Sequence, residues 1–167
     1  MVFEIFRQGV LNLMGQAENP CRLIGEAYQE DKMLLVHQKR KDLIALYFLY
    51  VQRIVLSCLF QQYSQTLEDV VTIEPYKTAI AGLGAEPIIY LYGSLAQLAV
   101  YPNSSKKEQQ WLLDQVQIYQ DNLQRWAHHA PMNHLHKFYL LMLRTALPKD
   151  TRPLYGSAKF ILRWVTL

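Results

Sequence analysis

Hydrophobic residues recur at helical spacing over most of the chain. Between residues 41 and 63 they follow the i, i+3, i+4, i+7 pattern of one helix face. The positions are Ile44, Tyr47, Phe48, Val51, Ile54, Val55, Cys58 and Leu59. A polar run over residues 61–65 predicts a turn, and Leu67, Val70 and Val71 then begin a second helical stripe. Alternation with a period of two is too weak to predict a sheet.

Prolines and glycines divide the next part of the chain. Pro75 falls within the second stripe and is expected to bend or break that helix, because proline lacks a backbone donor and clashes with the preceding turn. Gly82 and Gly84 suit the end of the helix and a reversal of the chain. The segment from Pro87 to Tyr101 is apolar nearly all round, which predicts a helix covered on more than one side.

Two further helices have clear start signals. Ser105, followed three residues later by Glu108, fits a capping box. The apolar stripe of the helix that follows is Leu112, Val116, Tyr119, Leu123 and Trp126. Pro131 suits the first turn of another helix, and Pro148 is expected to stop it. A last helix is predicted over residues 155–164.

These elements predict an all-α fold, an antiparallel helix-pair repeat of the TPR-like α-solenoid type. We expect one domain over residues 1–167, with helix-pair units at about 41–82 and 85–130 and an atypical segment at 148–167. One helix pair cannot bury its apolar faces alone, so such units stack on one another. The period exceeds that of a standard tetratricopeptide repeat, and its consensus is poorly matched.

Composition and charge argue against several classes of protein. A hydrophobic fraction of 51% excludes a disordered chain. The net charge of +3 comes from dispersed residues, which argues against a nucleic-acid partner. Cys21 and Cys58 have no metal or disulfide spacing, and the first residues lack a basic region followed by an apolar stretch. We therefore predict a cytoplasmic protein.

The segment over residues 43–60 is apolar enough to be tested as a membrane span. Gln52 and Arg53 lie in its middle, and a central arginine costs about 2.5–3.5 kcal/mol in a bilayer. A buried core helix is therefore predicted, without a membrane partner. Peripheral binding to a membrane through this segment is a third hypothesis for function.

Residue patterns of known catalytic sites are not found. The run Gly82-Leu83-Gly84 lacks the third glycine, the preceding strand and the Lys-Ser/Thr of a phosphate-binding loop. Kinase catalytic and metal-binding motifs are missing, and no Ser-His-Asp or Cys-His grouping is proposed. His128, His129, His134 and His136 fall close together, but their spacing favours helix-end and inter-helix hydrogen bonds over metal binding. We predict no enzyme activity, cofactor or metal.

Three stretches nevertheless have a distinctive combination of residues. They are Asn19-Pro20-Cys21-Arg22-Leu23-Ile24-Gly25-Glu26-Ala27-Tyr28, Leu91-Tyr92-Gly93-Ser94-Leu95-Ala96 and Trp126-Ala127-His128-His129-Ala130-Pro131-Met132-Asn133. Together they resemble the helical, TPR-like region of very large cyanobacterial signalling proteins. Those proteins join a serine/threonine kinase, an AAA/STAND-type ATPase, this helical region, a GAF sensor domain and a histidine kinase.

The resemblance covers roughly residues 7–143. It implies a linker scaffold between the ATPase and the sensor and histidine-kinase domains, present here as a fragment, and it transfers no catalytic residue. Pro75 and the segment from Leu147 onward depart from the family pattern.

We therefore predict a non-catalytic scaffold that binds protein, either other domains of a signalling kinase or a peptide. The candidate interaction residues are Tyr92, Trp111, Trp126, His129 and Asn133. Self-association through uncapped solenoid ends is also expected. The alternative is an all-α small-ligand-binding or enzymatic domain with an apolar pocket around residues 88–101.

Overall fold

The computed structural model describes residues 1–80 and 85–146. Within these ranges the regular structure is helical, apart from one antiparallel bridge between Ile24 and Gln29. The predicted all-α class is thus confirmed. The α-helices are α1 Val2–Leu13, α2 Glu30–Arg40, α3 Leu43–Leu59, α4 Tyr63–Thr72, α5 Glu86–Val100, α6 Lys106–His129 and α7 Pro131–Ala146, and the 3-10 helices are η1 Glu74–Ile80 and η2 Tyr101–Asn103.

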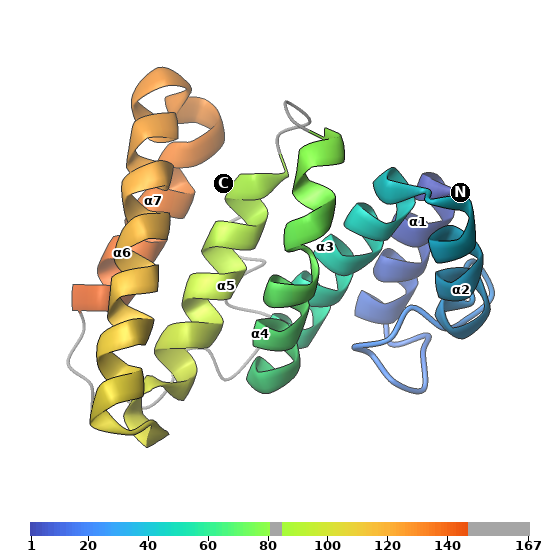
Figure 1. Ribbon diagram of the computed structural model, residues 1–167, viewed down its shortest axis with the longest axis horizontal. Helices are drawn as coiled ribbons and strands as arrows, with labels where there is room; N and C mark the ends of the chain where they lie inside the picture. The colour runs from blue at the N-terminus through green and yellow to red at the C-terminus, as the bar shows by residue number, and fades with distance from the viewer. Residues whose placement is uncertain (81–84, 147–167) are drawn as a thin grey trace.

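The helices stand side by side in a row, from α1 and α2 at one end to α6 and α7 at the other (Figure 1). Neighbours in sequence pack together from α2 onward, and in addition α1 contacts α3, α3 contacts α5, and α5 contacts α7. The odd-numbered helices therefore form one continuous layer, against which α2, α4 and α6 pack. Helices α3 and α4 fall within residues 41–82, and α5 and α6 fall within residues 85–130.

Helix α3 is the centre of the larger core. The Asp42 side chain caps its first turn by accepting a hydrogen bond from the Ala45 N–H at 3.1 Å. Its fully buried side chains include Tyr47, Leu49, Ile54 and Leu56. Among the described residues, no helix is both long enough and apolar enough to cross a bilayer. The apolar run over residues 43–60 instead serves as a core helix, as predicted.

Pro75 has the effect predicted for it. Helix α4 ends at Thr72, and Pro75 lies in the 3-10 helix η1 that follows. The α-helical pattern is broken there because proline cannot supply the N–H that a continuing helix requires. The predictions for Gly82, Gly84, Pro148 and residues 155–164 lie outside the described residues.

Helix α5 is covered on two sides because Gly93 lets its neighbours approach. A Cβ added at Gly93 would lie 3.3 Å from Val70 of α4 and 3.5 Å from Tyr119 of α6. Tyr90, also on α5, packs both against the core around α3 and against a second cluster formed with α6 and α7. The prediction that residues 87–101 form a helix buried on more than one side is confirmed.

Both predicted helix starts are also confirmed. The Glu108 N–H donates to Ser105 Oγ at 3.4 Å, and the Ser105 N–H donates to Glu108 Oε2 at 2.8 Å, which completes the capping box of α6. Pro131 is the first residue of α7. Helices α1 and α2, by contrast, are not among the predicted elements. The apolar residues of α1 do recur at helical spacing, but most of them lie on its exposed side, and the buried residues of α2 are Glu30 and His37.

Candidate functional site

The five predicted interaction residues do not share one surface. Trp111 and His129 are exposed on one stripe of α6, with the exposed Ile118 between them. Asn133 is exposed in the first turn of α7. Tyr92 is packed against the core around α3, and burial raises the pKa of its hydroxyl to about 12.

Trp126 belongs to a stack of aromatic rings between three helices. The Tyr90 ring centroid lies 4.5 Å from that of Tyr119 and 5.3 Å from that of Trp126, with all three rings nearly parallel. Tyr119 and Trp126 are two helical turns apart, about 10.5 Å along α6, so Tyr90 fits between them. His134 of α7 contacts Trp126, with 6.0 Å between centroids. Trp126 therefore joins α5, α6 and α7.

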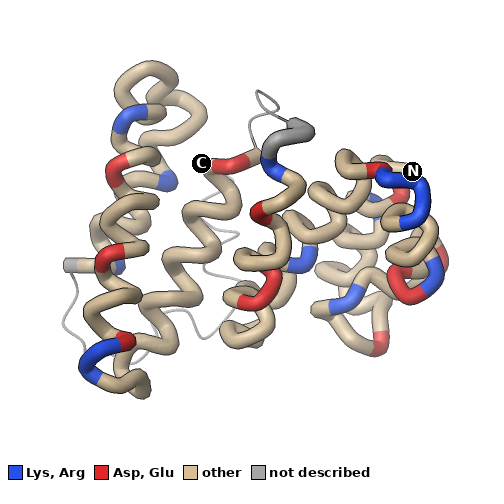
Figure 2. The backbone as a smooth tube through the Cα atoms, in the orientation of Figure 1, with Lys and Arg blue, Asp and Glu red and all other residues tan. Residues whose placement is uncertain are grey.

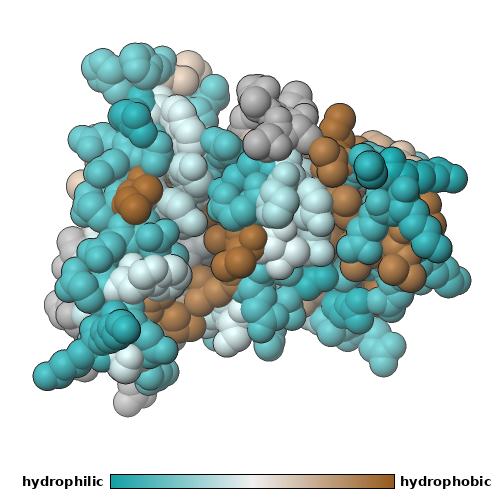
Figure 3. Space-filling model, in the orientation of Figure 1, coloured by the Kyte–Doolittle hydropathy of each residue, from teal (hydrophilic) through white to brown (hydrophobic). Residues whose placement is uncertain are grey.

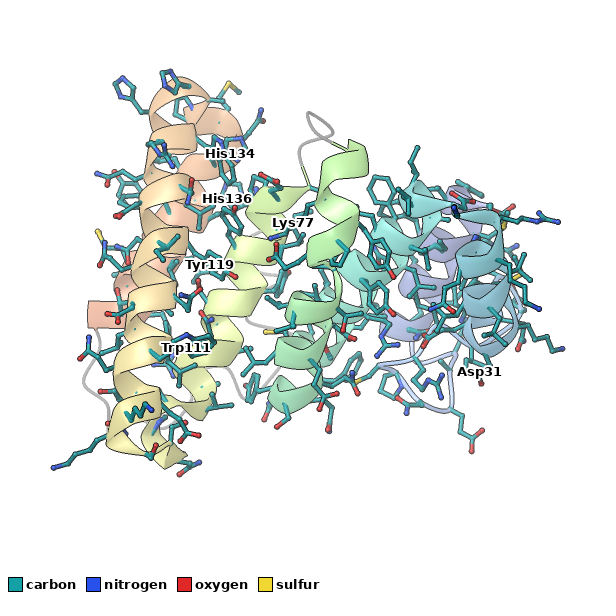
Figure 4. The ribbon with its side chains drawn as sticks, in the orientation of Figure 1. Asp31, Lys77, Trp111, Tyr119, His134 and His136 are labelled. Carbon is teal, nitrogen blue, oxygen red and sulfur yellow. The ribbon has the colours of Figure 1, made fainter. Side chains whose placement is uncertain are left out.

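Three of the side chains labelled in Figure 4 belong to this stack or contact it. Lys77, Tyr119 and His134 come from η1, α6 and α7, and all three lie on the side of α6 that is turned toward α5 (Figure 4). The Lys77 ammonium lies 5.5 Å from the Tyr90 ring centroid and 2.5 Å from Glu74. These contacts hold the middle of the row of helices together rather than leaving the rings free for a ligand.

A hollow lies where α6 turns into α7. Only Ala130 separates the two helices, so the hairpin is tight. The hollow has a volume of about 530 Å³. Its apolar lining residues are Ala127, Pro131, Leu135 and Phe138, and its polar ones are Gln124, Arg125, His128 and His129. The predicted residue His129 therefore lies at a real concavity.

An apolar stripe on α7 continues from this hollow. We call Met132, Tyr139, Met142 and Leu143 the α7 stripe; all four side chains are exposed, and Met132 is 94% exposed. Leu135 of the hollow and Met142 of the stripe lie side by side on one flank of α7, since their helical angles both fall between those of Phe138 and Tyr139. The apolar surface is therefore continuous from the turn along the outside of α7.

The charge at this end is positive. Asp121 is the last acidic residue of α6, and residues 122–146 contain Arg125, Lys137 and Arg144 but no Asp or Glu (Figure 2). Burial lowers the pKa of both His134 and His136, and the charge of Lys137 adds to the effect at each ring. A partner with acidic residues around apolar ones would fit this surface.

The other end of the molecule contains a buried ion network. Arg53 of α3 donates from Nε to Asp69 Oδ2 at 3.0 Å and from a terminal nitrogen to Glu30 at 2.9 Å. Glu30 is fully buried and also accepts from the Leu23 N–H at 2.9 Å. Burial raises the pKa of Asp69 to about 6, against the opposing effect of Arg53.

This network cross-links α2, α3 and α4. In the sequence, the only sign of it is an arginine in the middle of an apolar helix, which requires a buried partner. The acidic partners are not recognisable there, because Glu30 and Asp69 lie 23 and 16 positions from Arg53.

A second hollow of about 570 Å³ lies beside the ion network. Its lining is largely polar: Asn19, Pro20, Cys21, Arg22, Arg53, Phe60, Gln62 and Gln65. Neither this hollow nor the one at the α6–α7 turn is lined by residues 88–101, where the alternative hypothesis places an apolar pocket.

No protein-family model, no curated protein and no solved structure matches this chain. The resemblance to the helical region of signalling kinases therefore depends on the quoted motifs alone. The surfaces described above provide a separate argument for function.

Metal ligands are not assembled in the described part of the chain. Over residues 1–80 and 85–146, no three His, Cys, Asp or Glu side chains are grouped so as to hold a metal ion. His37, which the sequence pattern does not single out, is fully buried, and its Nε2 lies 3.0 Å from the Tyr28 hydroxyl. Its Nδ1 lies 3.4 Å from Asp42, so this histidine links α2 to the start of α3.

Proposed function

We propose that this chain is a non-catalytic helical scaffold that binds another protein, with the α6–α7 end as its binding surface. The observation that carries the proposal is the exposed α7 stripe beside a hollow that is lined by both apolar and polar side chains. Contiguous exposed apolar surface next to a concavity is typical of protein-binding sites, whereas scattered exposed residues are not.

The scaffold is of the TPR-like α-solenoid type in this proposal. The continuous layer of α1, α3, α5 and α7 supports it, because stacked helix pairs contact their neighbours in this way. The three quoted motifs support a parent of the signalling-kinase type, in which the module lies between an ATPase and the sensor and histidine-kinase domains. Its partner would then be another domain of such a cytoplasmic protein.

The chemistry of the partner follows from the surface. An amphipathic helix would place one apolar side chain in the hollow against Leu135 and Phe138 and lay its apolar face along the α7 stripe. Acidic residues at its edge would face Arg125 and the imidazoles of His128 and His129. Apolar anchors would contribute most of the affinity, and the charges mainly the specificity.

A peptide selection tests this function. Displayed amphipathic peptides are selected on the wild-type chain and titrated in solution against it and three variants. Met132→Asp and Leu143→Asp place a carboxylate in the α7 stripe and should each weaken binding at least about tenfold. Ile118→Asp, a matched exposed position on α6, should leave binding unchanged.

The enriched peptides should be acidic and apolar, with affinities of about tens of micromolar or tighter. Failure to select any such peptide would remove the basis of the proposal. Equal weakening by Ile118→Asp would place the binding surface elsewhere.

We propose small-ligand binding as a second candidate function, at the polar hollow beside Arg53. Its volume is in the range of small-molecule sites, and two guanidinium groups, those of Arg22 and Arg53, line it. A thermal-shift screen with polar metabolites tests this second candidate, because a ligand that binds only the native state raises the stability of the protein. The absence of any stabilisation would exclude this candidate.

A further inference from the structure

Helix α1 leaves a stripe of four apolar side chains in solvent and buries two side-chain amides beside Ile5. The exposed fractions are 74% for Phe3, 40% for Phe6, 55% for Val10 and 51% for Leu13, and we call these four residues the α1 stripe. The buried face of α1 instead contains the amides of Gln8 and Asn12, which are fully buried. Exposed apolar surface of this kind marks an interaction site.

Hydrogen bonds prevent α1 from rotating to hide this stripe. Gln8 Oε1 accepts from the N–H groups of Ala27 and Tyr28 at 3.0 and 3.2 Å. Asn12 Nδ2 donates to the carbonyl oxygens of Pro20 and Arg22 at 3.1 and 2.6 Å. Turning the helix would leave all these buried groups without partners, at a cost that exceeds the gain from covering the stripe.

The contact with α3 fixes the same orientation. An added Cβ at Gly9 would overlap the Gln52 side chain, so α1 lies close against α3 at this glycine. On the edge of the stripe, the Phe6 and Phe48 rings meet with 5.4 Å between centroids. Ile44, also on α3, is 45% exposed and extends the apolar surface beyond α1. Figure 3 shows brown areas at this end of the molecule.

The spacing of the α1 stripe is the same read in either direction. The intervals between positions 3, 6, 10 and 13 are three, four and three. If a second copy of α1 lies antiparallel about a two-fold axis near position 8, Phe3 faces Leu13 of the other copy and Phe6 faces its Val10. Each aromatic ring then meets an aliphatic side chain, as complementary packing requires.

The size of the surface fits a second copy. With about 200 Å² for a fully exposed large apolar side chain, the stripe and Ile44 offer roughly 500 Å² per copy and about 1,000 Å² for the pair. This is the lower limit of specific interfaces, so we expect a reversible dimer. On α1 itself, Arg7 is paired with Glu26 at 2.6 Å, so this charge has a partner when two copies meet.

We propose that this chain forms an antiparallel homodimer through the α1 stripe. The inference goes beyond the proposed binding of a partner at the α7 stripe, because the two surfaces lie at opposite ends of the row of helices (Figure 1).

Light scattering and sedimentation of the full chain, from about 1 to about 300 μM, test the dimer. The wild-type mass should rise from that of one chain to that of two and then stop. Phe3→Asp and Leu13→Lys should each weaken association at least about tenfold, because each places an unpaired charge opposite an apolar residue. Circular dichroism should show the helicity unchanged, since both side chains are exposed.

The double variant Phe3→Asp with Leu13→Lys decides the arrangement. In the antiparallel dimer the new carboxylate at position 3 faces the new ammonium at position 13 of the other copy, twice, so dimerisation returns. In a parallel dimer like charges face one another, and in a head-to-tail contact with α7 the two new charges never meet. Met132→Asp on the α7 stripe should leave the dimer intact.

A chain that stays monomeric up to the highest concentration overturns the proposal. So does growth beyond two chains that Met132→Asp abolishes, which would mean head-to-tail stacking. A double variant that remains monomeric overturns the antiparallel arrangement. Peptide binding by Phe3→Asp, measured separately, distinguishes a failure of this proposal from a failure of the proposed function.

Discussion

Arg53 shows how much of this fold depends on one residue. Its guanidinium is largely buried and is shared between Glu30 of α2 and Asp69 of α4. Forming such a buried ion pair contributes little net stability. Removing one partner destabilises the protein much more, because it leaves an uncompensated charge in the interior.

Replacing this guanidinium should therefore destabilise the chain strongly. Arg53→Met keeps most of the volume but removes the cation that pairs with buried Asp69 and leaves buried Glu30 with Arg22 alone, at 3.3 Å. This should lower the free energy of unfolding by about 3–5 kcal/mol. Urea unfolding followed by circular dichroism measures it. The control is Arg7→Met, whose pair with Glu26 is exposed and should contribute at most about 1 kcal/mol. Equal effects of the two substitutions would contradict the network's role.

Asp69 should give stability a specific pH dependence. Burial raises its folded-state pKa from 3.8 to about 6, so between these values the folded chain binds more protons than the unfolded chain. The contribution of Asp69 to stability is therefore present at low pH and is lost as pH rises through about 6. Relative to Asp69→Asn, which does not titrate, the wild type should lose about 2 kcal/mol between about pH 4.5 and about pH 7.5. Urea unfolding of both chains at both pH values measures this difference. A rise in the free energy of unfolding of the wild type relative to Asp69→Asn over this pH range would contradict the prediction.

At the scale of elements, α1 and the loop that follows it are held together by side-chain amides. The loop over residues 14–29 has little regular structure, and the Gln8 and Asn12 side chains supply partners for its backbone. A loop of this length is ordered only when its polar groups are satisfied in this way.

Substitution of Gln8 should release that loop without unfolding the rest. Gln8→Leu removes the acceptor shared by the Ala27 and Tyr28 N–H groups, so both should exchange with solvent deuterium at least about tenfold faster. The Ala45 N–H, bonded to Asp42 at the start of α3, serves as an internal control and should keep its protection. Unchanged exchange at Ala27 and Tyr28 would show that Gln8 does not order the loop.

At the scale of the whole molecule, two apolar surfaces lie at opposite ends of one row of helices. The helices in the middle of the row pack together through the Tyr119–Tyr90–Trp126 stack and the core around α3. The two ends of the row, α1 and α7, are therefore held at a fixed separation. In the proposed dimer, α1 joins two copies and two α7 stripes face outward. Such a dimer would bind two partner molecules at once. If those two partners are themselves linked, the second binding event is intramolecular, and the apparent affinity for the linked partner rises.

The sequence by itself determined most of the helices from α3 onward and several of their ends. Local signals sufficed for the capping box at Ser105, the proline that begins α7 and the break at Pro75, because each acts within one turn of backbone. Periodic apolar residues likewise located α3, α5 and α6, whose buried faces are hydrophobic.

Tertiary structure decided which faces are covered and which polar residues are buried. In α1 the apolar residues recur at helical spacing but are exposed, and the buried side carries Gln8 and Asn12, whose partners lie in a loop up to 20 positions away. Trp126, expected at an interaction surface, is packed in the ring stack because Tyr90 of α5 reaches between two turns of α6. Long-range pairings of this kind, including Arg53 with Glu30 and Asp69, leave no periodic signal, because they depend on which helices become neighbours in space.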